Sequence, residues 1–168
     1  NKEIKIALAL IILACSIFLF NSGEIGYGIV VLIIMGLVIL SIFKDERIVK
    51  AFYHLRKNDM KKAALTLNKI KHPEKLIRSQ EAYYYYLNGL ILSQTQMNQS
   101  EKFFKKALSI GLRTDTDKAV AKLNLAGLAM SRRKKREATT LITEAKKLDK
   151  HNMLDEQLKM MKQQLKRI

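Results

Sequence analysis

The chain has 168 residues, with 31 Lys and Arg, 15 Asp and Glu, and a formal net charge of +16. Hydrophobic residues make up 48% of it, which excludes a disordered chain, and one Cys excludes a disulfide scaffold or a zinc site built on several cysteines. Only four charged residues precede Lys44, so the net charge lies in residues 44–168. The sequence therefore divides into an apolar first part and a basic remainder.

The first part, residues 1–43, contains two apolar runs at residues 4–20 and 25–43. A helix rises about 1.5 Å per residue, so the second run is long enough to cross a hydrocarbon core of roughly 30 Å. Asn, Ser, Gly and Glu at residues 21–24 are typical of a tight turn. The pattern predicts two antiparallel transmembrane helices, because backbone polar groups in lipid must be satisfied internally.

The distribution of Lys and Arg predicts the orientation of these helices. The connecting turn has no Lys or Arg, whereas Lys44, Arg47 and Lys50 follow the second run at once. The positive-inside rule then places both termini, and residues 44–168, on the cytoplasmic side of a bacterial-type inner membrane. An alternative interpretation makes residues 1–20 a cleaved signal peptide, which leaves residues 44–168 on the same side.

Residues 44–168 are predicted to be helical throughout, because apolar residues recur there at spacings of three and four. Gly, Pro, Asn and Asp mark the breaks between helices. These breaks fall at residues 57–59, 71–73, 96–99, 111–116 and 149–152, with a further turn near 131–135. The fold class is therefore all-α, with about six helices and a last one.

An internal repeat runs through this helical part. Its clearest copy has Tyr84, Leu87 and Asn88 on one helix, and Ser100, Phe104 and Ala107 on the next. The small residue of the second helix recurs as Ala63, Ser100 and Ala138, with spacings of 37 and 38 residues. This resembles the tetratricopeptide repeat, whose period is about 34 residues. Lys122 departs from that pattern, since the third copy should carry an aromatic residue there.

The resemblance implies a solenoid of about three helix pairs, at residues 46–75, 79–113 and 116–150, with a capping helix at 152–168. An ordinary helical bundle, or a solenoid of another helix-pair family, is the alternative. In the family, the first helices of the pairs line a groove that holds a peptide or a helix. The residues that would line this partner groove here are Tyr85, Gly89, Leu92, Leu123, Gly127 and Met130.

The sequence also bears on what this groove binds and on the role of the last helix. The chain lacks the Lys, Asn and Arg set with which some family members hold chaperone C-termini, so that subtype is disfavoured. The last helix carries an apolar stripe and either caps the third pair, fills the groove itself, or binds a partner or a membrane surface. The stripe consists of Leu154, Leu158, Met161, Leu165 and Ile168.

Two local clusters are candidates for contacts with partners. Four consecutive tyrosines sweep about 300° of a helix, so they cannot all be buried; Tyr84 is expected in the core, and Tyr83 and Tyr86 at an interface. The second cluster is a basic turn that either stays solvated or meets anionic lipid or RNA phosphates. It consists of Arg132, Arg133, Lys134, Lys135 and Arg136.

No catalytic pattern is present in the sequence. There is no HExxH, Gly-rich phosphate loop or GxSxG elbow, and the three histidines are far apart. We therefore expect no enzyme activity, cofactor, metal or small-molecule substrate. The predicted function is a membrane-anchored adaptor that binds a membrane-associated protein within a larger membrane complex. The alternatives are a basic tether for ribosomes, RNA or anionic lipid, and a small structural subunit of a transporter or translocase.

Overall fold

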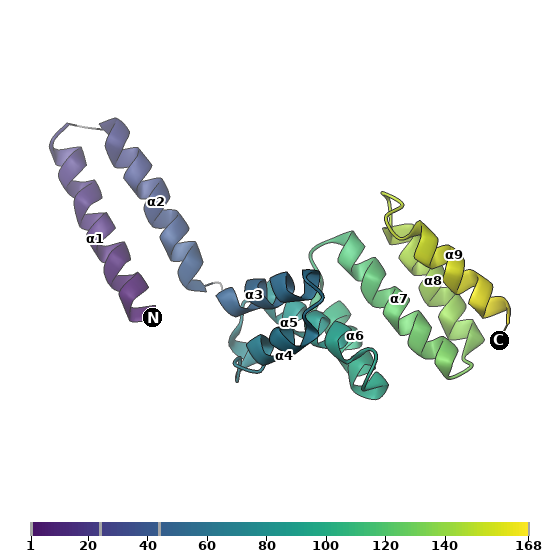
Figure 1. Ribbon diagram of the computed structural model, residues 1–168. Helices are drawn as coiled ribbons and strands as arrows, with labels where there is room; N and C mark the ends of the chain where they lie inside the picture. The colour runs from purple at the N-terminus through teal and green to yellow at the C-terminus, as the bar shows by residue number, and fades with distance from the viewer. Residues whose placement is uncertain (1, 24, 44, 168) are drawn as a thin grey trace. The chain divides into compact units, whose positions relative to one another are not determined.

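The computed structural model describes the backbone of residues 2–23, 25–43 and 45–167, and the side chains of residue 7 and residues 9–23, 25–36 and 45–167. These residues form helices and short connections with no strand among them, which confirms the all-α prediction. The chain divides into two compact units, Asn1–Glu46 and Arg47–Ile168. Figure 1 shows the helices of both units.

The first unit is a helical hairpin of α1 (Lys2–Asn21) and α2 (Ile25–Phe43), which pack against each other. Gly23 has a φ of 80° in the turn, a left-handed conformation that glycine adopts without a steric penalty. Gly28 lets the two helices approach, because a Cβ there would lie 3.0 Å from the ring of Phe20. Large apolar side chains such as Phe18 and Tyr27 stay exposed on this hairpin.

The predicted integral membrane location is wrong. A bilayer crossing needs roughly 20 consecutive apolar residues in one helix, and no helix within the described residues has both the length and the apolar character. This finding corrects the predicted transmembrane pair at residues 4–20 and 25–43, and the inner-membrane location with a cytoplasmic domain that was inferred from it.

The second unit is a series of helices joined by short connections. Its elements are α3 (Glu46–Arg56), α4 (Met60–Leu67), the 3-10 turn η1 (Pro73–Lys75), α5 (Arg78–Leu92), α6 (Met97–Ile110), α7 (Asp115–Ser131), α8 (Lys135–Leu148) and α9 (Asp155–Lys166). The helix ends coincide with the breaks in the sequence pattern. Helix α4 has only eight residues and is shorter than the sequence suggests.

Side-chain capping explains several of these helix ends. The Asp59 side chain accepts a hydrogen bond from the backbone N–H of Lys62, and the Thr114 side chain accepts one from Asp117, so α4 and α7 each begin with a satisfied donor. Gly111 ends α6 with a φ of 108°. The carboxylate of Asp149 accepts hydrogen bonds from the N–H groups of residues 153 and 154, which positions the start of α9.

Consecutive helices repeat a common arrangement: α5 packs closely with α6 (the second pair), and α7 with α8 (the third pair). Helices α3 and α4, called the first pair here, are joined by a turn like the one between α7 and α8. The turns of the first and third pairs share a left-handed residue, Asn58 with a φ of 59° and Arg133 with a φ of 57°. The next residue in each turn donates to a carbonyl five positions earlier, over 2.9 Å. In the second pair the corresponding donor, Gln96, reaches only four positions back, to Leu92. The hydrogen-bonded turn of the second pair therefore spans one residue fewer, although α5 already ends at Leu92 and the connection at residues 93–96 has four residues.

The pairs bury equivalent residues where their two helices cross. Ala63, Ser100 and Ala138 on the second helices have no exposed surface. The larger residues four positions further on, Leu67, Phe104 and Ile142, are at most 1% exposed. The buried hydroxyl of Ser100 donates to the carbonyl of Gly89 over 2.8 Å, so it carries no desolvation penalty from an unmade hydrogen bond.

Candidate functional site

The candidate site is a groove of about 460 Å³ in the second unit, formed by the α5–α6 turn, α7 and α9. Its lining combines apolar side chains with amide and hydroxyl groups. The lining residues are Ser93, Gln94, Met97, Leu123, Asn124, Gly127, Leu128, Ser131, Gln157, Met160, Met161 and Gln164. No charged residue is among them, so the groove is suited to an apolar side chain of a ligand.

Helix periodicity explains which residues reach this groove. Leu123, Gly127 and Ser131 lie four residues apart and so share one face of α7. On α9, positions 157, 160, 161 and 164 share a face in the same way. Met161 packs beside Gly127, and its methyl carbon would lie at an ordinary contact distance of 3.8 Å from a Cβ added at residue 127.

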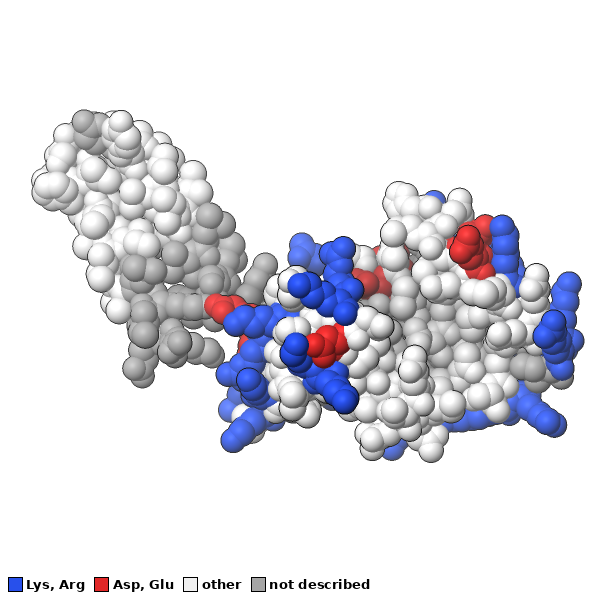
Figure 2. Space-filling view, in the orientation of Figure 1, with Lys and Arg blue, Asp and Glu red and all other residues white. Residues whose placement is uncertain are grey.

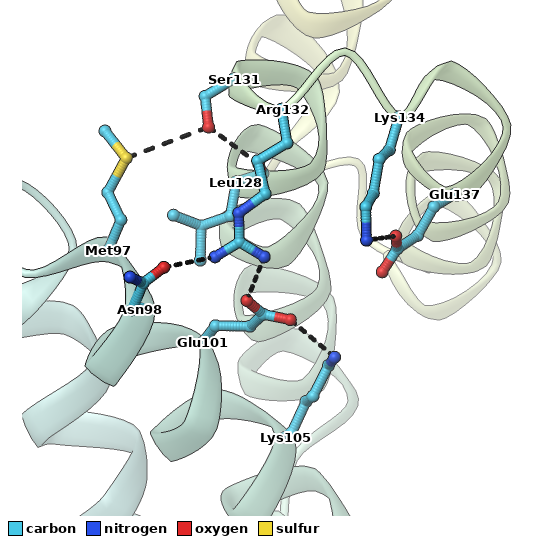
Figure 3. A network of polar contacts seen from close by, with 9 residues as sticks. All are labelled: Met97, Asn98, Glu101, Lys105, Leu128, Ser131, Arg132, Lys134 and Glu137. Carbon is cyan, nitrogen blue, oxygen red and sulfur yellow. Dashed lines mark hydrogen bonds and ion pairs between the residues drawn. The ribbon is translucent and has the colours of Figure 1, made fainter.

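Two methionines present the most accessible apolar surface of the groove. Met97 is 48% exposed and Met160 is 56% exposed. The hydroxyl of Ser131 lies 3.9 Å from the sulfur of Met97 and donates to the carbonyl of Leu128 over 2.8 Å (Figure 3). Unbranched, polarisable methionine side chains adapt their shape to a partner, so this surface can accommodate apolar groups of several shapes.

Helix α9 is held against α7 and α8 by its own apolar stripe. Leu154 and Leu158 are 7% and 3% exposed and belong to the core cluster of α7 and α8. Met161 and Leu165 pack against the same cluster. The last helix therefore covers the third pair, and one of its faces forms a wall of the groove.

Of the six residues predicted to line a partner groove, the structure brings only Leu123 and Gly127 to this cavity. Tyr85 and Gly89 are buried between α5 and α6, and Met130 is 6% exposed within the core of the third pair. Leu92 is half-buried outside the groove lining. On α9, Met161 belongs to the predicted apolar stripe, whereas Gln157, Met160 and Gln164 were not predicted, although their spacing was visible in the sequence.

The tyrosine cluster is divided differently from the prediction. Tyr85 and Tyr86 are buried, at 7% and 4% exposure, whereas Tyr83 and Tyr84 are half-buried. Tyr86 packs with Phe104 and is thus part of the core rather than an interface. Helix α5 packs against α6 and also contacts α7 through Tyr83, so its buried arc is wider than that of a helix with one neighbour.

The hydroxyl of Tyr83 donates to the carboxylate of Asp117 on α7 over 2.6 Å. Partial burial, followed by this hydrogen bond and the negative charge of Asp117, raises the pKa of Tyr83 to about 12. All three effects disfavour the phenolate. The contact therefore joins the second and third helix pairs through a neutral tyrosine.

The basic turn between α7 and α8 is partly neutralised. Arg132 donates to Glu101 over 2.6 Å and to Asn98 over 2.7 Å, which ties this turn to α6 (Figure 3). Lys134 lies 3.6 Å from the carboxylate of Glu137. The other three cations of the turn are exposed and form no ion pair with a described residue: Arg133, Lys135 and Arg136.

No group of His, Cys, Asp and Glu that could hold a metal ion occurs among the residues whose side chains are described. Comparison with known proteins returned no matching family model, no matching curated protein and no matching solved structure. The fold and the groove therefore define the chain only as a helical, repeat-like protein with an uncharged surface groove.

Proposed function

We propose that this protein is a scaffold of three tetratricopeptide-like helix pairs that binds a segment of another protein in the groove between α7, α9 and the α5–α6 turn. One observation carries the proposal: Met97 and Met160 stand half exposed beside a groove without charged lining residues. Covering this surface with apolar side chains of a partner would remove apolar area from water, which favours association.

The size of the groove supports a peptide-like partner. A volume of about 460 Å³ is within the range of small-ligand pockets and holds a few side chains, not a folded domain. Apolar anchors at helical or extended spacing are how short segments bind helical grooves. The repeated burial of Ala63, Ser100 and Ala138 supports the tetratricopeptide-like architecture of the scaffold.

The test is affinity purification of the full-length chain from its own cells, with mass spectrometry of the proteins retained. The groove variant carries Met97→Gln and Met160→Gln, which keep the side-chain length but make it polar. The control variant carries Met153→Gln, because Met153 is 70% exposed and does not line the groove. We expect the same proteins with the wild type and the control, and their loss with the groove variant.

Folding of each variant is checked by far-UV circular dichroism, and all three chains should give the same helical spectrum. A partner retained by a folded groove variant would exclude this groove as the binding site. A partner lost equally by the Met153→Gln control would show that the effect is not specific to the groove.

A further inference from the structure

The acidic residues of the third helix pair and α9 gather toward one end of these helices, where lysines such as Lys118 and Lys150 accompany them. Helix α8 returns from the end of α7, and α9 returns from the end of α8, so the start of α7 and the start of α9 are at one end. An ion pair of 3.3 Å between Asp115 and Lys150 supports this arrangement. Six of the seven acidic residues in positions 115–167 lie toward that end: Asp115, Asp117, Glu144, Asp149, Asp155 and Glu156.

The opposite end, where α7 meets α8 and α9 terminates, is cationic. Its cations are Arg132, Arg133, Lys134, Lys135, Arg136, Lys166 and Arg167. Two carboxylates face them, and both are already engaged: Glu101 with Lys105 and Arg132, and Glu137 with Lys134. Lys and Arg side chains appear at the end of the second unit where α9 ends (Figure 2).

This cationic end adjoins the groove on two sides. Ser131 lines the groove, and two peptide units separate it from Arg133, so their Cα atoms are at most about 7.6 Å apart. Gln164 also lines the groove, and Arg167 follows three residues later, a spacing that makes residues neighbours on a helix surface. Neither arginine forms an ion pair with a described residue.

We propose that the groove binds an acidic peptide segment, in which a large apolar side chain enters the cavity and neighbouring carboxylates meet Arg133 and Arg167, while Lys135 of the same turn adds to the positive potential. This inference rests on the proposed function and adds the chemistry and the direction of the partner. Without a competing internal carboxylate, these cations attract an anionic ligand, and the uncharged groove beside them selects an apolar anchor. Nucleic acid fits less well, because the described residues that line the groove include no aromatic side chain to stack on a base.

The test uses a library of random 12-residue peptides displayed on phage and selected on the immobilised full-length chain at low salt. The Met97→Gln/Met160→Gln chain removes peptides that bind elsewhere. We expect the remaining peptides to combine one or two large apolar residues with several Asp or Glu. A synthetic, fluorescently labelled copy of a selected peptide then gives the affinity by fluorescence polarisation.

The cation variant carries Arg133→Gln, Lys135→Gln and Arg167→Gln. Its matched control carries Lys50→Gln, Lys61→Gln and Lys71→Gln, three exposed residues of the first pair and the segment after it, with the same change in net charge. We expect the cation variant to bind the peptide about tenfold more weakly or worse, since exposed ion pairs contribute modestly but add up. The control should bind within about twofold of the wild type, after the general charge effect is screened by salt.

Each contrary result has a distinct meaning. Groove-dependent peptides without acidic residues, or equal binding by the cation variant, would overturn this inference and leave the proposed function intact. Failure to recover any peptide that depends on Met97 and Met160 would contradict both. Binding of a labelled 20-nucleotide single-stranded RNA that is lost in the cation variant, with no competition by an acidic peptide, would replace the peptide with nucleic acid.

Discussion

The second and third helix pairs have the same framework but fill it with different side chains. In the second pair, Phe104 packs so closely on Gly89 that a Cβ there would lie 2.9 Å from the ring. At the equivalent positions of the third pair, Ile142 and Ala126 belong to one core cluster and are at most 1% exposed. A large residue against glycine is thus exchanged for a medium residue against alanine. The volume at the crossing, rather than either residue, is what the framework requires.

A second position shows the same exchange with polar groups. In the second pair, Lys106 donates to the hydroxyl of Tyr85 over 2.7 Å and lies 4.1 Å from the centre of its ring. In the third pair, the equivalent residues are Lys122 and Glu144, which form an ion pair. In the first pair, the guanidinium of Arg47 reaches the carbonyl of residue 69 over 2.6 Å. An aromatic residue is therefore not required at position 122, because the ion pair of Lys122 joins the two helices at that point.

The largest expected effect tests the crossing of the second pair. Phe104 has no exposed surface, so Phe104→Ala should reduce the free energy of unfolding by about 3–5 kcal/mol. Ile142→Ala removes fewer atoms from the equivalent position and should cost less. Urea unfolding of the full-length variants, followed by far-UV circular dichroism, measures both. A larger loss for Ile142→Ala would show that the two crossings are not equivalent.

The two helical glycines of these pairs should respond to alanine with opposite signs. Gly89→Ala places a methyl group against the buried ring of Phe104, and we expect a net loss of about 1–2 kcal/mol. Gly127→Ala meets only the end of Met161 at an ordinary contact distance, and the higher helix propensity of alanine should stabilise the protein by about 0.5–1 kcal/mol. The same urea experiment gives both values.

A double variant sharpens this test. Gly89→Ala combined with Phe104→Ile reproduces in the second pair the residues found in the third. If volume at the crossing is the requirement, the double variant is more stable than the sum of the two single changes predicts. Simple additivity of the two losses would contradict the exchange of volumes between the pairs.

The helices, and the buried positions on the second helix of each pair, could be predicted well from the sequence. Which face of the first helix is buried could not. Apolar spacing and turn residues are local signals, and they located Ala63, Ser100 and Ala138. A constant offset of 38 residues, however, aligns Lys122 with Tyr84. The hydrogen-bonded turn that ends α7 contains one more residue than the turn that ends α5, which makes the offset 37 on the first helices, so the equivalent of Lys122 is Tyr85. An alignment error of one residue rotates the predicted buried face by about 100° around the helix axis, which is enough to exchange core and surface positions.

The groove could be predicted only in part, and the reason is different. Leu123 and Gly127 follow from the helix pattern of α7, but the other walls come from α9 and the α5–α6 turn. Their positions depend on tertiary packing, in particular on Leu154 and Leu158 entering the core of the third pair. The amphipathic stripe showed that α9 covers an apolar surface and left open which surface it covers.

The hydrogen bond between Tyr83 and Asp117 joins the second and third pairs. It should make the free energy of unfolding depend on pH in the alkaline range. The pKa of Tyr83 is raised to about 12 in the folded protein, from 10.0. The stability that this contact contributes is therefore complete below about pH 10 and lost as the pH rises through 12. After allowance for solvent screening of a half-exposed group, we expect about 1 kcal/mol. Urea unfolding at several pH values should show a shallower decline for Tyr83→Phe than for the wild type, and identical declines would contradict the prediction.

The smallest expected effect is a difference in salt dependence between two contacts, Tyr85–Lys106 in the second pair and Lys122–Glu144 in the third. Double-mutant cycles isolate each coupling energy from the general effect of net charge. The cycle of Lys122→Met with Glu144→Gln reports an ion pair between half-exposed groups, about 0.5 kcal/mol at low salt and close to zero at 1 M salt. The cycle of Tyr85→Phe with Lys106→Met reports a hydrogen bond to a neutral hydroxyl, so its coupling should change little with salt. Equal salt dependence of the two couplings would show that the bridges share one kind of interaction, and the chemical exchange between the pairs would then be limited to their cores.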